Sequence, residues 1–250
     1  MLRFLYAIAV LALVAITAVV TAPSFALRAL IPEPLRGSVD VVEASGLLAQ
    51  GRVVLLVNGV RVPLAWTIDP APLLQGRLEA TIRPYERDEG PPRGRVGWSS
   101  GRLSLDNVVL LLPARVALPP AYAAGGALVG GELRIDARHV EQRGTAFDGS
   151  ARVAWQGARL LAAKGAPVID LGDVDLALNA NGARLEGTIA NRGGALALAG
   201  NFTVGPGGAL RASVLATPRN ADDRSLVPGL SALGRPEGAG WRLDWPAGAR

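Results

Sequence analysis

The chain has 250 residues, of which half are hydrophobic, and a formal net charge of +5. This hydrophobic content argues against an intrinsically disordered chain, and the absence of cysteine excludes disulfides, thiolate metal sites and a cysteine nucleophile. The basic residues are almost all arginines scattered among predicted strands, without a long basic run, so the sequence does not favour nucleic-acid binding.

The first predicted element is an N-terminal segment without charged residues, from Phe4 to Leu27. As a helix it would be roughly 36 Å long, which is enough to cross the hydrocarbon core of a bilayer. A cleaved secretory signal is the alternative, because Ser24 and Ala26 supply the small residues of a cleavage site. We expect a retained membrane anchor over residues 1–27 with a cytoplasmic start, followed by a β-rich domain over residues 28–250.

Short apolar segments separated by glycine, asparagine and proline predict β-strands in the first half of the domain. Asn58–Gly59 predicts a two-residue hairpin turn, because both residue types accept positive φ. Pro70 and Pro72 should end a strand, with one short helical turn before Gly76, and a turn is expected near Asp106–Asn107. Strands are predicted at residues 38–43, 51–57, 60–68 and 77–83, then from residue 95 and at 101–108, 131–137 and 150–155, with irregular segments at 85–94 and 118–125.

The clearest pattern is a meander from Val174 to Ala216, in which apolar residues alternate with small or polar ones. Turns are expected at Asn181–Gly182, Asn191–Gly194 and Gly205–Gly208, so the strands should pair antiparallel. Seven apolar residues should share one side of this sheet: Leu176, Leu178, Leu185, Ile189, Leu196, Leu198 and Phe202. The predicted fold is mainly β: an N-terminal transmembrane helix, then a twisted antiparallel meander curled into an open groove or a partly closed sandwich.

One helix is predicted in the domain, over residues 221–233, with Asn220 as its cap and Gly234 at its end. Pro228 should limit this helix or split it into two short turns. A final strand is predicted from Gly240 to Trp245.

Residues suited to catalysis are few. His139 is the single histidine, and without a partner cluster an exposed turn residue is a better interpretation than a metal ligand or a general base. Asp170, Asp173 and Asp175 lie close in sequence, but the first two have ordinary turn chemistry rather than the arrangement of a glycosidase pair. Gly205–Gly208 precedes a strand and not a helix, so it lacks the geometry of a phosphate loop. We therefore predict that the protein is not an enzyme, with no catalytic, cofactor-binding or metal-binding residues and no cofactor.

The sequence also contains five tryptophans, and aromatic residues on strands usually fill a core or an interface. The alternative is a set of platforms that face sugar or lipid. The five are Trp66, Trp98, Trp155, Trp241 and Trp245.

Three stretches of the sequence resemble protein N of the bacterial type II secretion system: Trp66–Gly76, Trp98–Leu105 and Leu226–Trp245. In the last of them, Leu230–Gly234 followed by Gly240–Trp245 looks like the closing helix and strand of that family. The resemblance covers nearly the whole chain. It implies an inner-membrane anchor with a periplasmic β-rich body, and it supplies no catalytic residues.

The function implied by this resemblance is that of a non-enzymatic accessory subunit of the type II secretion system. Such a subunit would cross the bacterial inner membrane once through residues 4–27, hold its bulk in the periplasm and contact other secretion subunits. The family is also similar to larger AsmA-like proteins, whose curled sheets form apolar grooves linked to lipid handling. An AsmA-like lipid-binding or lipid-transfer module of the cell envelope is therefore the alternative, with lipid as its partner.

Overall fold

The computed structural model describes residues 39–83, 91–117, 128–144, 146–161, 168–205 and 210–245. The chain divides into two compact units, Met1–Val108 and Val109–Arg250, here called unit 1 and unit 2. The predicted anchor over residues 1–27 lies outside the described residues. In the part of the chain that the structure describes, no helix is long and apolar enough to span a bilayer.

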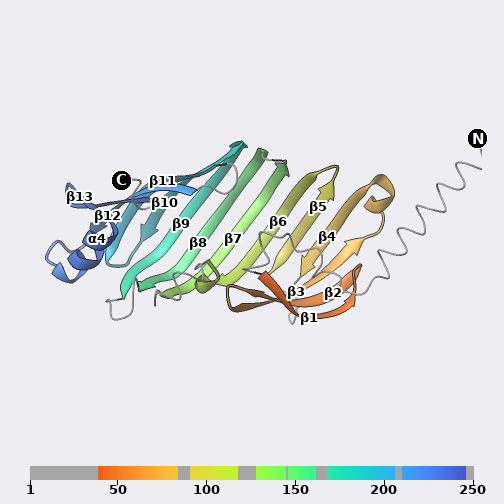
Figure 1. The fold of residues 1–250 in the computed structure, drawn as a ribbon, viewed down its shortest axis with the longest axis horizontal. Helices are drawn as coiled ribbons and strands as arrows, with labels where there is room; N and C mark the ends of the chain where they lie inside the picture. The colour runs from red at the N-terminus through yellow and green to blue at the C-terminus, as the bar shows by residue number, and fades with distance from the viewer. Residues whose placement is uncertain are drawn as a thin grey trace, which may run out of the picture. The chain divides into compact units, whose positions relative to one another are not determined.

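The described part of the chain is mainly β, as predicted, and its fourteen strands form an antiparallel sheet (Figure 1). The strands follow one another in chain order, except that β14 lies between β12 and β13. The first six strands are β1 (Val39–Leu47), β2 (Gln50–Val57), β3 (Val60–Asp69), β4 (Arg77–Arg83), β5 (Arg93–Ser99) and β6 (Arg102–Pro113). The others are β7 (Leu128–Arg143), β8 (Ala146–Leu161), β9 (Ile169–Gly182), β10 (Arg184–Arg192), β11 (Leu196–Val204), β12 (Leu210–Pro218), β13 (Arg235–Glu237) and β14 (Gly240–Trp245).

The structure confirms two turns that the sequence predicts in unit 1. Val57 pairs with Val60, and the two residues between them, Asn58 and Gly59, have φ of +47° and +79°, so the predicted hairpin is confirmed. The expected helical turn is the 3₁₀ helix η3 (Pro72–Gln75), which Gly76 ends in the left-handed conformation.

The turn predicted near Asp106–Asn107 is wrong, because β6 continues through these residues to Pro113. Asn107 has a φ of +50°, a conformation that asparagine accepts more readily than other residues with a side chain. The positive φ therefore changes the backbone locally without ending the strand. A second short 3₁₀ helix, η4 (Ala114–Ala117), follows β6.

The strands β7 and β8 each contain 16 residues and are much longer than the strands predicted at 131–137 and 150–155. Their pairing shifts register between Gly130 and Glu132 and again between Ala137 and His139. Each β-bulge adds a residue and inverts the alternation of side chains, so the period of two is lost at these points although the strand continues.

The predicted antiparallel meander is confirmed in β9 to β12. One turn differs by a residue: Asn181 pairs with Arg184, so the turn residues are Gly182 and Ala183 rather than Asn181 and Gly182. Gly182 has a φ of +65° at the first central position, which type II′ turns reserve for glycine. The registers also place the seven predicted apolar residues on one face, because Ile189 pairs with Leu176 and Gly187 pairs with Leu178 and Phe202.

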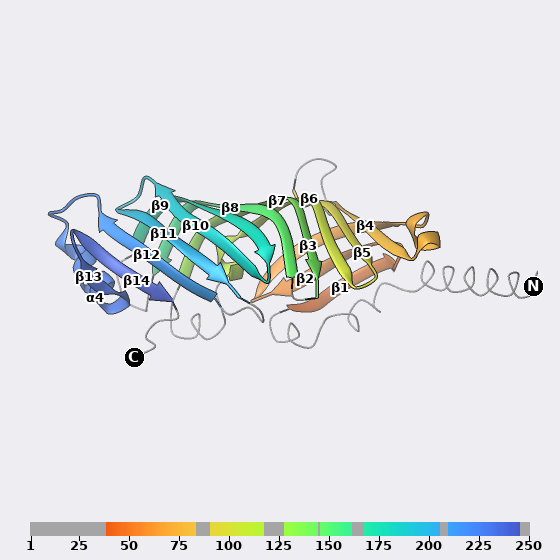
Figure 2. The same cartoon turned by 90° about the horizontal axis from the view of Figure 1, so that it is seen from above.

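The predicted helix starts later than expected and is split. Asp223, and not Asn220, caps the 3₁₀ helix η6 (Arg224–Leu226) by accepting a hydrogen bond from the Ser225 backbone N–H. The α-helix α4 (Val227–Leu233) follows, with Pro228 in its first turn, where the missing N–H is harmless. In Figure 2, α4 and β13 lie beside β14 at the C-terminal end of unit 2. The strand predicted at 240–245 is confirmed as β14.

Candidate apolar pocket

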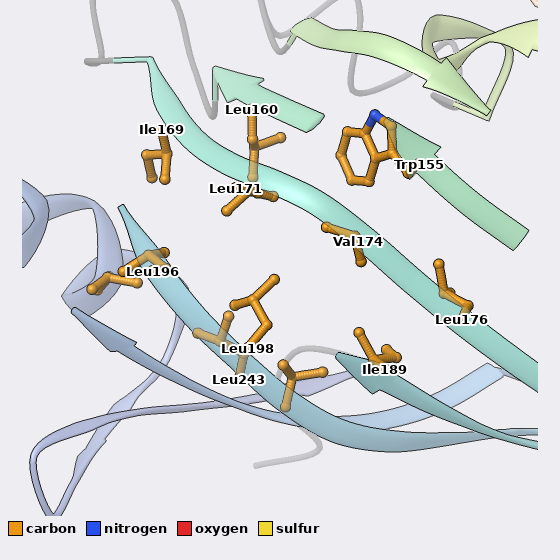
Figure 3. Close-up of a pocket in the computed structure, with 12 residues that line it drawn as sticks. Trp155, Leu160, Ile169, Leu171, Val174, Leu176, Ile189, Leu196, Leu198 and Leu243 are labelled. Atoms are coloured by element: carbon orange, nitrogen blue, oxygen red, sulfur yellow. The ribbon is translucent and has the colours of Figure 1, made fainter. Parts of the chain in front are cut away.

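A pocket of about 240 Å³ lies on the apolar face of unit 2, and all twelve side chains that line it are aliphatic or tryptophan (Figure 3). One wall comes from β8 and β9: Trp155, Leu160, Ile169, Leu171, Val174 and Leu176. The other wall comes from β10, β11, β12, β14 and α4: Ile189, Leu196, Leu198, Val214, Leu243 and Leu230. The pocket is therefore a product of the alternating meander and of the short helix that follows it.

Strand register explains how these side chains reach one face. Trp155 pairs with Val174, Ile189 with Leu176, and Val214 with Leu243, and residues directly opposite in a sheet point to the same side. Along β10 and β11, where the pairing is regular, every second residue then points to this face. Register shifts between Trp155 and Arg159 change the alternation in β8 and at the start of β9.

The sheet of unit 2 must be curved to form this pocket. Five strand spacings separate β8 from β14 in the strand order, and a flat sheet would hold these strands about 24 Å apart. Side chains from both strands nevertheless line one space of about 240 Å³. In Figure 3, side chains of β8 and β9 point toward those of β10, β11 and β14 from opposite sides, as a curved sheet allows.

The lining residues differ in exposure, and each wall contains both buried and partly exposed side chains. Ile169, Val174, Leu196 and Leu230 are buried, with exposed fractions between 1% and 4%, and they belong to the hydrophobic core of unit 2. Other lining residues pack against this core but stay partly exposed: Trp155, Leu160, Leu176, Ile189, Leu198 and Leu243. The lining therefore combines buried core residues with partly exposed apolar residues, and the latter are here called the rim.

Asn191 is a polar residue on this apolar face, opposite Val174, and its amide is fully used by the backbone. Its Nδ2 donates to the carbonyl oxygens of Leu171 at 2.6 Å and Leu196 at 2.8 Å, and its Oδ1 accepts from the Leu198 N–H at 2.7 Å. The β10–β11 ladder ends one residue earlier, at the pair Ala190 and Ala199. The Asn191 side chain thus replaces the next ladder bonds and joins β9, β10 and β11 beside the pocket.

Two glycines allow the backbone to cross closely at the same end of the sheet. A Cβ atom on Gly172 would lie 2.2 Å from the Arg192 carbonyl oxygen, and one on Gly194 would lie 2.4 Å from the Leu171 carbonyl carbon. Both glycines also have φ near +70°. A larger residue at either position would separate β9 from the β10–β11 turn.

Charged residues of these strands lie on the opposite face. Asp175, which neighbours Val174 and Leu176 in β9, pairs with Arg152 at 2.8 Å and with Arg192 at 3.6 Å. Both arginine side chains are largely exposed, so the pairs contribute little to stability. Their position leaves the pocket without a charged neighbour on its own face of β9.

The sequence-predicted candidates for catalysis lie outside the pocket lining. His139 is exposed at the β7 bulge, within a strand and not in a turn. Asp170 accepts a hydrogen bond from the Gly172 N–H at 2.9 Å and Asp173 from the Gly157 N–H at 3.0 Å, so both shape the irregular pairing of β8 and β9. Among the residues that the structure describes, no group of three or more His, Asp or Glu side chains is arranged to hold a metal.

Ion pairs at the surface shift the pKa values of Glu237, Arg242, Arg134 and Arg143. A hydrogen bond from Arg242 holds the pKa of Glu237 below its ordinary value, and the same bond raises the pKa of Arg242. Asp136 raises the pKa of Arg134 in the same way, and Glu141 that of Arg143. Each shift favours the charged form that the group already has at neutral pH, so none of these groups becomes an acid or base for catalysis.

The sequence left two interpretations of the tryptophans open, residues that fill a core or an interface and platforms that face sugar or lipid, and individual tryptophans differ in this respect. Trp66 packs over Gly51 and donates to the Leu48 carbonyl oxygen at 2.6 Å, as a structural aromatic residue does. Trp155 lines the pocket, with its Nε1 donating to the Gly130 carbonyl oxygen at 2.8 Å. Trp98 in unit 1 is 54% exposed, so it is not a core residue.

Sequence reasoning found four of the twelve lining residues, those of β10 and β11 and Leu176. Its alternation also contained Val174 and Val214, but it missed the contributions of β8, Ile169, Leu171, α4 and β14. Trp155 and Leu243 stand in alternating segments that the sequence already predicted as strands, so the signal for their orientation was present. Their convergence depends on the curvature of the sheet.

A family model described as "Type II secretion system (T2SS), protein N" matches residues 37–243 of this chain. Comparisons with curated proteins and with solved structures give no match. The matched region contains every strand that the structure describes, apart from the last two residues of β14, and therefore the whole pocket lining. This chain belongs to the protein N family of the type II secretion system.

Proposed function

We propose that this protein is a non-enzymatic accessory subunit of the type II secretion system that is anchored in the inner membrane and acts through protein contacts in the periplasm. The observation that carries the proposal is the family match, which extends over residues 37–243. The lining of the pocket adds support, because aliphatic and indole groups offer neither a nucleophile nor an acid–base pair.

The edges of the sheet are poor sites for strand addition. The β1 edge carries a bulge between Val41 and Glu43, and the β13 edge has three residues with Pro236 at the centre. Bulges, short strands and proline all discourage pairing with another chain. We therefore expect partner subunits to bind through side chains.

Two exposed apolar residues, Leu74 and Trp98, lie at one end of the β4–β5 pair in unit 1. Arg77 at the start of β4 pairs with Ser99 at the end of β5, so η3 and the turn after β5 lie at the same end of the sheet. Leu74 in η3 is 76% exposed and Trp98 in β5 is 54% exposed. Exposed tryptophan is enriched in protein interfaces, where it often contributes much of the binding energy. We assign this end of unit 1 to contact with another secretion subunit.

The proposal is tested by secretion from the bacterium that encodes the protein. Deletion of the gene should leave a type II substrate in the periplasm and lower its amount in the culture medium. Complementation with Trp98→Ala or Leu74→Ser should restore secretion less well than the wild type, while Val168→Ser, at a residue 61% exposed in unit 2, should restore it fully. Normal secretion in the deletion strain would refute the proposed role.

The anchor is tested separately. Membranes washed with alkaline carbonate should retain the protein, because Phe4–Leu27 has no charged residue and can span a bilayer. A mature protein whose mass corresponds to an N-terminus at Leu27 would show instead that the segment is a cleaved signal.

The alternative role, an AsmA-like lipid-binding or lipid-transfer module, is favoured by the apolar pocket. A filled core would favour the secretion subunit, and an open groove would favour the lipid-binding module. Unit 2 contains both a tightly packed core and a partly exposed apolar rim. Loss of secretion without a change in envelope lipid composition would favour the secretion role.

A further inference from the structure

We propose that the apolar pocket of unit 2 binds one acyl chain of a membrane phospholipid. This inference rests on the anchor of the proposed function and gives the lipid-binding alternative a definite ligand, and it holds whichever subunit the protein contacts.

The lining restricts the ligand to hydrocarbon. All twelve lining side chains are aliphatic or indole, and the Trp155 N–H is already bonded to the Gly130 carbonyl. The neighbouring amide of Asn191 is occupied by the backbone of Leu171, Leu196 and Leu198. A polar or charged ligand group inside the pocket would lose its hydrogen bonds to water without replacement.

The volume restricts the size of the bound part. An apolar cavity of roughly 150 Å³ can hold benzene, and on that scale a pocket of about 240 Å³ holds roughly ten carbon atoms. A fused sterol ring system exceeds this number, whereas a flexible acyl chain can insert part of its length. The partly exposed rim at Leu176, Ile189 and Leu198 lets the rest of the chain and its headgroup remain outside.

The source of the chain follows from the N-terminal segment. The uncharged run Phe4–Leu27 is long enough to cross a bilayer, and eleven residues separate it from β1. An extended linker of that length reaches at most about 40 Å, which would keep the body close to phospholipid. Since the pocket contains only apolar contacts, binding should depend on the acyl chain and not on headgroup charge.

The experiment uses the full-length protein in cells that incorporate a fatty acid bearing a diazirine and an alkyne into their phospholipids. Ultraviolet light crosslinks the diazirine to neighbouring side chains, and the alkyne allows labelled peptides to be enriched. Trypsin cleaves after Lys164, Arg184, Arg192 and Arg211, so β9 and β11 are recovered in separate peptides. We expect label in the peptides 165–184 and 193–211, which contain Val174 and Leu198 of the two facing walls.

A filled pocket provides the decisive variant. Ile189→Phe combined with Leu198→Phe adds apolar volume from β10 and β11, and should lower labelling of peptide 165–184 roughly tenfold, because each methylene kept out of the pocket lowers the affinity about fourfold. Leu178→Phe is the matched control, since Leu178 shares this face of β9 but does not line the pocket, and its labelling should equal that of the wild type.

Resistance to protease in membrane vesicles establishes that each variant is folded. If the double variant is not resistant, Val214→Phe fills the pocket from β12 and takes its place. Equal labelling in a folded filled variant and in the wild type would overturn the inference. Absence of label from both wall peptides of the wild type would overturn it as well, and neither result depends on the secretion assay.

Discussion

Docking of α4 on the sheet depends on Leu230, whose side chain is 1% exposed and belongs to the core of unit 2. Leu230→Ala removes three carbon atoms, which corresponds to a loss of about 2.4 kcal/mol in transfer free energy, and the unfilled space adds to this. Because Leu230 also borders the pocket, the substitution enlarges an existing space. We expect the free energy of unfolding to fall by about 3 kcal/mol, at the low end of such substitutions.

The assay is urea unfolding of the body, residues 28–250, followed by tryptophan fluorescence. With a denaturant slope of about 2 kcal/mol per molar, the transition of unit 2 should shift by about 1.5 M. Val227→Ala is the matched control on the same helix, because Val227 is 38% exposed and its truncation should cost about 0.5 kcal/mol. Equal midpoints for the two variants would refute the docking of α4 through Leu230.

Three further substitutions test a turn, a polar bridge and an ion pair. Gly182→Val should lower the free energy of unfolding by about 1 kcal/mol or more in thermal denaturation, because a φ of +65° strains a β-branched residue although no atom lies within 4 Å of the added Cβ. Asn191→Ala should lower it by about 3 kcal/mol in urea, since two carbonyl groups and the Leu198 N–H lose their partner. Arg242→Gln should raise the pKa of Glu237 toward its ordinary value of 4.5, as measured by NMR of the carboxyl carbon. Folding lowers the pKa of Glu237, so the ion pair stabilises the protein at pH values above the pKa of Glu237 in the unfolded state. This stabilisation is lost as the pH falls through the pKa of Glu237 in the folded state. The wild type and Arg242→Gln should therefore become equally stable in acid.

For each of these three substitutions, one result would contradict the structural argument. An unchanged melting temperature for Gly182→Val would argue against the turn at Gly182–Ala183. If Asn191→Ala is as stable as the wild type, the side-chain bridge between β9 and β11 does not form in solution. A pKa of Glu237 that is the same with and without Arg242 would show that the ion pair is absent.

Several elements could be predicted because their causes are local. Asn58–Gly59 forms its turn because both residues accept positive φ, and β14 occupies the predicted residues because its alternation is uninterrupted. The long strands β7 and β8 were predicted too short because bulges reverse the alternation at Ala137–His139. The strand β13 was not predicted at all, because three residues around Pro236 have no strand pattern of their own and depend on pairing with β14.

The sequence by itself determined which residues alternate, where most turns fall and which side of β9 to β11 is apolar, since these properties depend on neighbours along the chain. Tertiary structure alone decided that the apolar side encloses a pocket. That outcome requires the curvature that brings β8 toward β14, the close backbone crossing at Gly172 and Gly194, and the docking of Leu230 against the sheet. Each of these joins residues distant in sequence, whose approach depends on how successive strands twist and pack, and no local pattern of side chains encodes it.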